Sequence, residues 1–182
     1  MLRDRDYIIT HENLIFRVFG YDHPQNGFLC DLEYAPQNLY IGSKKGYRIT
    51  PMGEIYYKFY SDEGIRYLDR NFPKYHIFVP YLNRRLIGVK NKYIKFVKKP
   101  DIELMKLISE CYARDQLINA MKEVIDIVSE RGGISYKKFG VFGSILHVFY
   151  SCKYSDIDLT IYGVKNLKKL LEVLKDLYTD SN

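Results

Sequence analysis

The sequence predicts an α+β fold, in which a β-rich N-terminal domain over residues 1–99 precedes an α/β domain over residues 100–182 that opens with a long helix. Short apolar runs separated by turn-forming residues fill the first half, as in a succession of strands. A stripe of apolar residues at helical spacing follows Lys98-Lys99-Pro100. A strand–turn–helix–strand pattern occupies the last third of the chain.

The N-terminal domain is expected to consist mainly of strands and turns. The strand-like runs are 7–10, 14–19, 28–34, 54–58 and 76–79. Pro80 ends the last of these, which makes it a candidate edge strand. A loop over 20–27 and a short capped helix over 61–68 lie between them. Residues 86–89 and 93–97 predict a hairpin around Lys90-Asn91-Lys92.

The C-terminal domain is expected to begin with a helix that Asp101 caps. A glycine at Gly132-Gly133 is expected to end it. The apolar stripe along this helix consists of Ile102, Met105, Ile108, Cys111, Tyr112, Leu117, Ile118, Met121, Val124, Ile125 and Val128. Leucines at helical spacing predict a last helix over 165–178.

The composition is that of a globular protein, with 47% hydrophobic and 27% charged residues. No run approaches the ~18 uncharged apolar residues of a membrane span, and the N-terminus has no apolar signal core. We therefore expect a cytoplasmic protein without membrane contact. Cys30, Cys111 and Cys152 lie far apart, so we expect small buried or half-buried residues. The net charge of +6 permits an anionic partner.

The run from Gly140 to Tyr162 contains the residues with the clearest chemistry. Gly143 and Ser144 predict a turn that lets the backbone approach a phosphate at the start of a short helix. Asp156 and Asp158 fall two apart on a predicted strand, so their side chains share one face. Ile157, Leu159 and Ile161 are expected to point into the core. Two adjacent carboxylates favour a cation such as Mg²⁺ between them.

This ordered combination resembles the signature of the DNA-polymerase-beta-like nucleotidyltransferases, and its acidic part is close to that of the minimal nucleotidyltransferases. The chain also resembles a group of mostly archaeal predicted nucleotidyltransferases. The resemblance implies that Gly143 and Ser144 bind a nucleoside triphosphate. It implies that Asp156 and Asp158 are catalytic and bind Mg²⁺ or Mn²⁺. The reaction would transfer a nucleoside monophosphate to a hydroxyl of an unknown acceptor, such as RNA.

The chain departs from that family at two places. Arg-Ala-Arg-Gly typically follows the Gly-Ser of the family, whereas Ile145-Leu146-His147-Val148 follows it here. His147 is the candidate for the basic position, although a packed histidine is the commoner interpretation. The family's third carboxylate lies on a later strand, which the sequence does not contain. The domain is therefore expected to be a fragment, a shortened member or an inactive one.

Alternatives to catalysis remain open. A degenerate site would leave a nucleotide- or nucleic-acid-binding module. An antitoxin-like partner of a HEPN-domain protein is a third alternative, although minimal antitoxins lack a β-rich extension. The candidate nucleic-acid contacts are Arg84, Arg85, Lys90, Lys92 and Lys95, which equally serve solubility. Asp31 and Glu33 faintly repeat the acidic pattern, and an exposed acidic strand face is the expected interpretation there.

Overall fold

The computed structural model describes residues 1–109 and 115–180, apart from the side chain of residue 180. The fold is α+β, and the chain divides into two compact units, Met1–Lys99 and Pro100–Asn182. We call them the N-terminal unit and the C-terminal unit. No helix among the described residues is long and apolar enough to cross a membrane.

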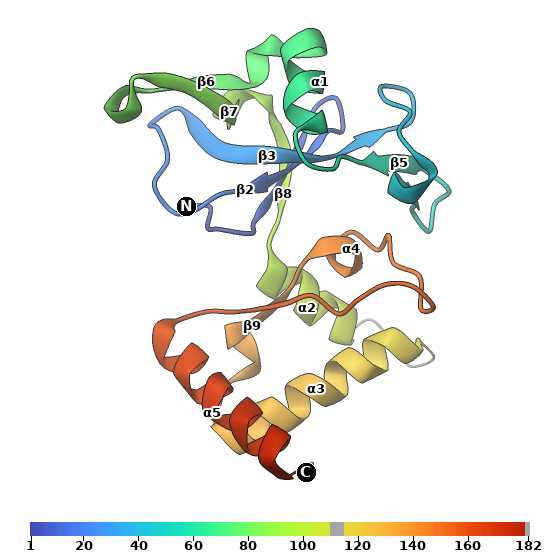
Figure 1. Cartoon of the computed structure of the whole chain (residues 1–182), viewed down its shortest axis with the longest axis vertical. Helices are drawn as coiled ribbons and strands as arrows, with labels where there is room; N and C mark the ends of the chain where they lie inside the picture. Colours follow the sequence, from blue (N-terminus) through green and yellow to red (C-terminus); the bar gives the residue numbers. More distant parts are fainter. Residues whose placement is uncertain (110–114, 181–182) are drawn as a thin grey trace. The chain divides into compact units, whose positions relative to one another are not determined.

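The N-terminal unit is built on an antiparallel sheet (Figure 1). Its strands are β1 (Tyr7–Thr10), β2 (Ile15–Val18), β3 (Gly27–Pro36), β4 (Tyr47–Ile49), β5 (Ile55–Lys58), β6 (His76–Val79), β7 (Arg84–Lys90) and β8 (Ile94–Lys98). The order is β4-β5-β3-β2-β1-β8, and β7 joins β3 to β6. The long strand β3 therefore pairs with three neighbours, namely β2, β5 and β7.

One face of this sheet packs into an aromatic-rich core beneath α1 (Glu63–Asn71). Phe16, Leu68 and Tyr75 are fully buried there. The phenol of Tyr75 and the ammonium of Lys74 both donate to the carboxylate of Glu12. Partial burial raises the pKa of Glu12, but these two hydrogen bonds outweigh it and lower the pKa to about 2.

The predicted hairpin between residues 86–89 and 93–97 is wrong. Strand β7 pairs with β3 and β6, whereas β8 pairs with β1. The segment between them is a 3₁₀ turn, η4 (Asn91–Tyr93), and it contains no glycine to form the tight reversal of a two-residue hairpin. Because Ile94 and Val97 pack against the core cluster, burial favours pairing with β1 over local pairing.

The predicted cap of the helix over 61–68 is also incorrect in detail. Helix α1 begins at Glu63, and Asp62 at its N-cap position makes no capping hydrogen bond through its side chain. The Asp62 carboxylate instead accepts from Arg66, one turn along the helix. The Glu63 carboxylate accepts from the Tyr60 N–H at 2.9 Å, so a neighbouring acid stabilises the entry to the helix.

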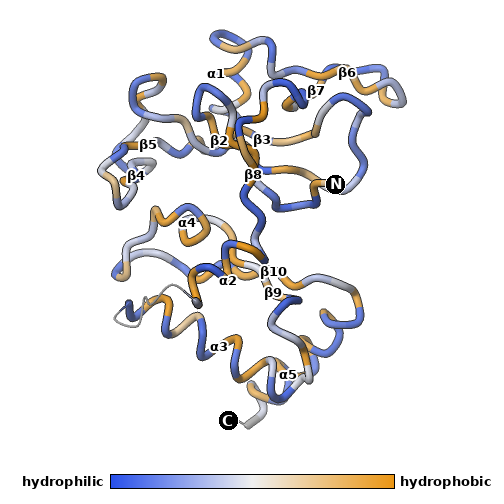
Figure 2. The backbone as a smooth tube through the Cα atoms, turned by 180° about the vertical axis from the view of Figure 1, so that it is seen from behind, coloured by the Kyte–Doolittle hydropathy of each residue, from blue (hydrophilic) through white to orange (hydrophobic). Residues whose placement is uncertain are grey.

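The C-terminal unit has four helices and a two-stranded antiparallel sheet among its described residues. The elements are α2 (Pro100–Ser109), α3 (Gln116–Gly132), β9 (Phe139–Val141), α4 (Gly143–Leu146), β10 (Leu159–Ile161) and α5 (Val164–Asp180). Figure 2 shows the alternation of apolar and polar residues along α3. Its apolar stripe buries Ile118, Met121, Ile125 and Val128.

The single long helix expected before the motif is instead two helices. Helix α3 begins at Gln116, after the extended N-cap residue Asp115, whose carboxylate accepts from the N–H groups of Leu117 and Ile118. Cys111 and Tyr112 of the predicted stripe lie outside the described residues. On α2 the buried residues include Leu104 and Leu107, and the expected Ile102 and Met105 are exposed.

The ends of these helices partly follow the prediction. Asp101 lies inside the first turn of α2, where its carboxylate accepts from the N–H of Ile102, so it is not the N-cap. The glycine C-cap of α3 is confirmed: Gly133 has a φ of 56° and donates to the Ser129 carbonyl.

Candidate functional site

The Gly143-Ser144 turn follows directly after β9. Phe142 is extended, and Gly143 then takes the left-handed φ of +65°, which favours glycine. Ser144 is half-buried, and its carbonyl accepts from the Phe149 N–H at 2.9 Å. Ile145 in the same short helix is fully buried. The core therefore anchors the turn and fixes the direction of the Ser144 backbone.

Asp158 lies against this turn. A Cβ atom built on Gly143 would be 2.5 Å from Oδ2 of Asp158, so any other residue at position 143 would displace this carboxylate. The Phe142 N–H also donates to the Asp158 carbonyl at 3.0 Å, one position beyond the β9–β10 ladder. The structure thus brings together Gly143 and Asp158, which are fifteen positions apart in the sequence.

The expected strand carrying both acids is wrong, because β10 begins only at Leu159. Asp156 and Asp158 precede it in a segment without regular secondary structure, in which Asp156 is exposed and Asp158 half-buried. Strand β9 ends at Val141, and the pairing continues for one hydrogen bond, from the Phe142 N–H to the Asp158 carbonyl, without forming a longer regular strand. Ile157, Leu159 and Ile161 are half-buried and not enclosed in the core as expected.

Asp115 fixes the loop between the turn and the acids. Besides capping α3, its carboxylate accepts from the Tyr150 hydroxyl at 2.7 Å and the Cys152 thiol at 3.4 Å. Partial burial raises the pKa of Asp115, but the hydrogen bonds from Tyr150 and the backbone outweigh it, so the pKa is lowered. Sequence reasoning missed this residue because its partners are 35 and 37 positions away.

The chain that follows α4 is largely buried, and one of its residues has a strained backbone conformation. His147 is 4% exposed and its ring stacks on Phe149, with centroids 5.3 Å apart. This confirms the interpretation of a packed histidine. Val148 has a φ of +58°, which is unusual for a β-branched residue. This is the position at which the family pattern has glycine after Arg-Ala-Arg.

The acidic pair suits Mg²⁺ only with help from a ligand. Mg²⁺ often binds through one or two carboxylates together with substrate phosphates. Asp158 Oδ2 lies beside the turn where a phosphate would approach, and the exposed Asp156 adds a second oxygen donor. The described residues contain no group of three or more His, Cys, Asp or Glu side chains placed to hold a metal ion.

The candidate nucleic-acid contacts do not form one cluster on a hairpin. Arg84 and Arg85 start β7, whereas Lys90 ends it, roughly 17–20 Å away along an extended strand. Lys92 lies over the ring of Tyr93 at 5.0 Å. Lys95 donates to the Asn13 side chain at 2.9 Å. Two separate groups of basic residues replace the single expected one.

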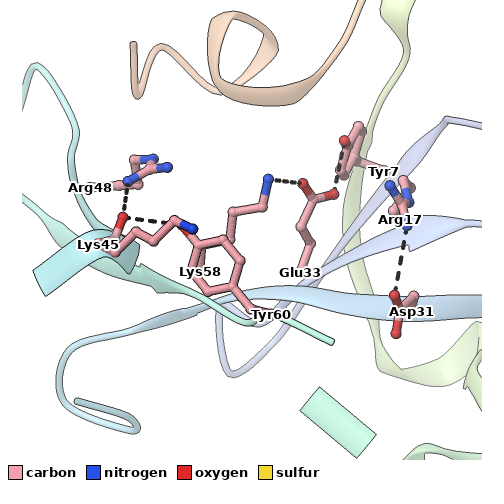
Figure 3. A network of polar contacts seen from close by, with 8 residues as sticks. All are labelled: Tyr7, Arg17, Asp31, Glu33, Lys45, Arg48, Lys58 and Tyr60. Carbon is pink, nitrogen blue, oxygen red and sulfur yellow. Dashed lines mark hydrogen bonds and ion pairs between the residues drawn. The ribbon is translucent and has the colours of Figure 1, made fainter. Parts of the chain in front are cut away.

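The expected exposed acidic face at Asp31 and Glu33 is wrong (Figure 3). Glu33 is 8% exposed and accepts from the Tyr7 hydroxyl at 3.0 Å, while Lys58 Nζ lies 3.3 Å from its other oxygen. Asp31 pairs with Arg17 at 3.7 Å. Burial raises the pKa of Asp31, against the influence of Arg17. Both acids are therefore paired with basic side chains, and neither forms an exposed acidic face.

The cysteines differ from one another. Cys30 is buried, as predicted, and burial raises the pKa of its thiol. Cys152 is exposed, contrary to the prediction, because it lies in the loop that Asp115 holds. Cys111 falls outside the described residues.

Comparisons with known proteins find one informative relative. An uncharacterized protein of the archaeon Methanocaldococcus jannaschii is 30% identical over 182 residues, which cover 99% of this chain and 53% of the relative. The chain thus spans about half the length of this curated relative. No protein-family model matches the chain, and no solved structure matches it.

Proposed function

We propose that the C-terminal unit is a nucleotidyltransferase domain. It binds a nucleoside triphosphate at Gly143 and Ser144, and it transfers the nucleoside monophosphate to a hydroxyl acceptor with release of pyrophosphate. The observation that carries the proposal is the contact between Gly143 and Asp158, which brings the predicted phosphate turn and an acid of the predicted metal pair together.

Each residue has a distinct role in this proposal. Gly143, without a side chain, leaves the backbone open to a phosphate, and the Ser144 hydroxyl and N–H donate to it. Asp156 and Asp158 would hold Mg²⁺ or Mn²⁺, which neutralises the phosphates and lowers the pKa of the attacking hydroxyl. Asp115 acts through the loop that it fixes and is a positioning residue.

The backbone at Val148 supports the proposal independently. Its φ of +58° is of the kind that favours glycine. The nucleotidyltransferase pattern has glycine at this position, and glycine is the residue that such a φ favours, whereas this chain has valine. We include RNA as a candidate acceptor, a further protein as a candidate partner, and the cytoplasm as the expected location of an enzyme that uses triphosphates.

The test is transfer of label from α-³²P-labelled nucleoside triphosphates to RNA or to the protein itself, with Mg²⁺ or Mn²⁺. The proposal predicts labelling that Asp156→Asn and Asp158→Asn both abolish. The matched control is Asp176→Asn, an exposed acid on α5 of the same unit. Labelling that survives in the Asp156→Asn protein would contradict the mechanism.

A second candidate function is nucleotide binding without transfer. It is favoured by the absence of a third acid near the pair among the described residues and by the bulky, buried Ile145, Leu146 and His147. It predicts that the wild-type chain binds a triphosphate but transfers nothing to an acceptor. The double variant Asp156→Ala/Asp158→Ala is expected to lose this binding.

A further inference from the structure

The N-terminal unit contains a pocket of about 620 Å³. Its volume is within the range of about 300–1,000 Å³ that is typical of small-molecule sites. It is lined by residues of β3, α1, β6 and β7 and by Phe19, which directly follows β2. The lining residues are Phe19, Leu29, Cys30, Asp31, Ile65, Asp69, His76, Arg85, Leu86 and Ile87. The proposed nucleotidyl transfer does not involve this pocket.

Most of this lining is apolar, and the polar groups on it are of two kinds. Asp31 and Asp69 supply carboxylate oxygens, and Asp69 also pairs with His76 at 3.0 Å. Arg85 supplies a cation that makes no hydrogen bond or ion pair with any described residue. Phe78 is directly opposite Arg85 in the β6–β7 pair and is 52% exposed. An aromatic ring and a guanidinium therefore flank each other on one strand face.

These groups restrict the chemistry of a ligand. A fatty acid would bring its apolar chain beside Asp31 and Asp69 without hydrogen-bond donors for them, which is costly. An acidic peptide would be repelled by the same carboxylates. A nucleotide unit offers a flat ring for the apolar walls, amino hydrogens for the carboxylates and a phosphate for Arg85.

The charge of the unit also favours a phosphate-containing ligand. Residues 1–99 contain 17 Lys and Arg against 10 Asp and Glu, whereas residues 100–182 contain 11 against 12. The whole excess of positive charge thus belongs to the N-terminal unit. The phosphate backbone of a nucleic acid is attracted to such a positively charged surface within about one Debye length, roughly 8–10 Å at physiological ionic strength.

We propose that this pocket binds one nucleotide of a single-stranded nucleic acid. The base enters between Phe19 and Ile65, Asp31 or Asp69 accepts from its amino group, and Arg85 pairs with the adjoining phosphate. All residues of this site belong to the N-terminal unit, and the proposal does not depend on nucleotidyl transfer.

The test is fluorescence anisotropy of labelled 12-mers of A, C and U with the full chain. Arg85→Ala is expected to weaken binding by about tenfold or more, since it removes both a phosphate contact and a wall of the pocket. Arg84→Ala is the matched control, because the neighbouring side chain points to the opposite strand face. Its effect is expected to stay below about threefold, as for one distant phosphate contact.

A second variant distinguishes binding of a base in the pocket from non-specific attraction between the positive surface and the phosphates. Phe19→Ala removes the aromatic wall of the pocket, leaves the charge unchanged, and is expected to reduce both the affinity and the quenching of 2-aminopurine placed within the 12-mer. Both variants change exposed side chains, and equal thermal melting checks that they fold. Equal losses from Arg84→Ala and Arg85→Ala would overturn the proposal, as would undiminished quenching in Phe19→Ala.

Two further experiments ask whether the pocket prefers a nucleotide within a strand to a free nucleotide, and whether it prefers a nucleotide to another small molecule. Calorimetric binding of nucleoside monophosphates at millimolar concentration, without measurable oligonucleotide binding, would overturn the single-strand part of the proposal. Saturable binding of L-phenylalanine, which also carries an amine, a carboxylate and an apolar group, without nucleotide binding would overturn it entirely. The Asp156→Ala/Asp158→Ala protein is expected to bind the 12-mers as the wild type does, so failure of the transfer reaction would not affect this result.

Discussion

The two units of the chain differ in how deeply their strands are buried and in how many strand partners they have. Every residue of β1 is buried, and β3 pairs with three strands. In the C-terminal unit, β10 has three half-buried residues and one strand partner among the described residues, and Val173 is the buried residue of α5. A few specific contacts therefore maintain the conformation of the candidate site. We expect individual substitutions there to have large local effects.

The largest effect is expected from Gly143→Ala. The new Cβ would meet Asp158 Oδ2 at 2.5 Å in addition to the cost of a left-handed φ, so we expect a loss of about 2–4 kcal/mol in stability. Gly20→Ala in the N-terminal unit is a matched control, because its φ is +66° and nothing lies within 4 Å.

For Gly20→Ala we expect only the conformational cost, about 1–2 kcal/mol. Chemical denaturation measures the loss of stability in each variant. Hydrogen exchange shows whether the change lies in residues 1–99 or in residues 100–182. Equal losses in the two variants would mean that Asp158 does not crowd Gly143.

Next in size is Glu12→Gln, which tests the core of the N-terminal unit. Removing the charge that Lys74 and Tyr75 stabilise is expected to cost about 1–3 kcal/mol at pH 7. Because the folded pKa of about 2 lies below the ordinary value of 4.5, this contribution is complete above pH 4.5. It disappears as the pH falls toward 2. Denaturation curves of the two proteins should converge over that interval, and a constant difference would be evidence against the ionised Glu12 contact.

Asp115→Ala tests the loop of the C-terminal unit. Loss of the α3 cap is expected to cost about 1–2 kcal/mol. Since its folded pKa is lowered, the contribution of Asp115 is present above the ordinary carboxyl pKa and is lost as the pH falls below it. Tyr150→Phe removes one of the hydrogen bonds and keeps the cap, so it should be milder. Hydrogen exchange over residues 150–158 should rise in both, and unchanged exchange in both would argue against the positioning role.

The smallest effect is expected from Val148→Gly, and it has the opposite sign. Glycine relieves the left-handed conformation, so we expect a gain of about 1 kcal/mol in stability. Val18→Gly, at a buried strand position of the N-terminal unit, should destabilise instead. A rise in the melting temperature measures the gain. A fall would indicate that packing of the Val148 side chain outweighs the strain.

Local patterns predicted much of the fold. The strands at 7–10 and 76–79 were found with the same bounds, because their apolar runs and Pro80 act within a few residues. The partner of β8 was not predictable in this way, since burial of Val97 against β1 depends on residues some ninety positions earlier. The Gly143-Ser144 turn and its short helix were also expected from the local sequence.

Other features of the candidate site depend on contacts that the sequence does not display. The hydrogen bonds of Asp115 to Tyr150 and Cys152 link distant segments. The left-handed Val148 contradicts the preference of its own residue type. The alternation of Asp156 and Asp158 predicted a strand, but the regular pairing of β10 with β9 begins only at Leu159.

The central claim is that the turn at Gly143 and the acids at Asp156 and Asp158 form one triphosphate site. The most direct measurement is a calorimetric titration of ATP, GTP, CTP and UTP into the chain with Mg²⁺ or Mn²⁺. We predict metal-dependent binding that Asp156→Ala/Asp158→Ala abolishes and that the charge-matched Glu172→Ala/Asp176→Ala on α5 retains. Absence of binding to the wild-type chain, or equal binding by both double variants, would contradict the account.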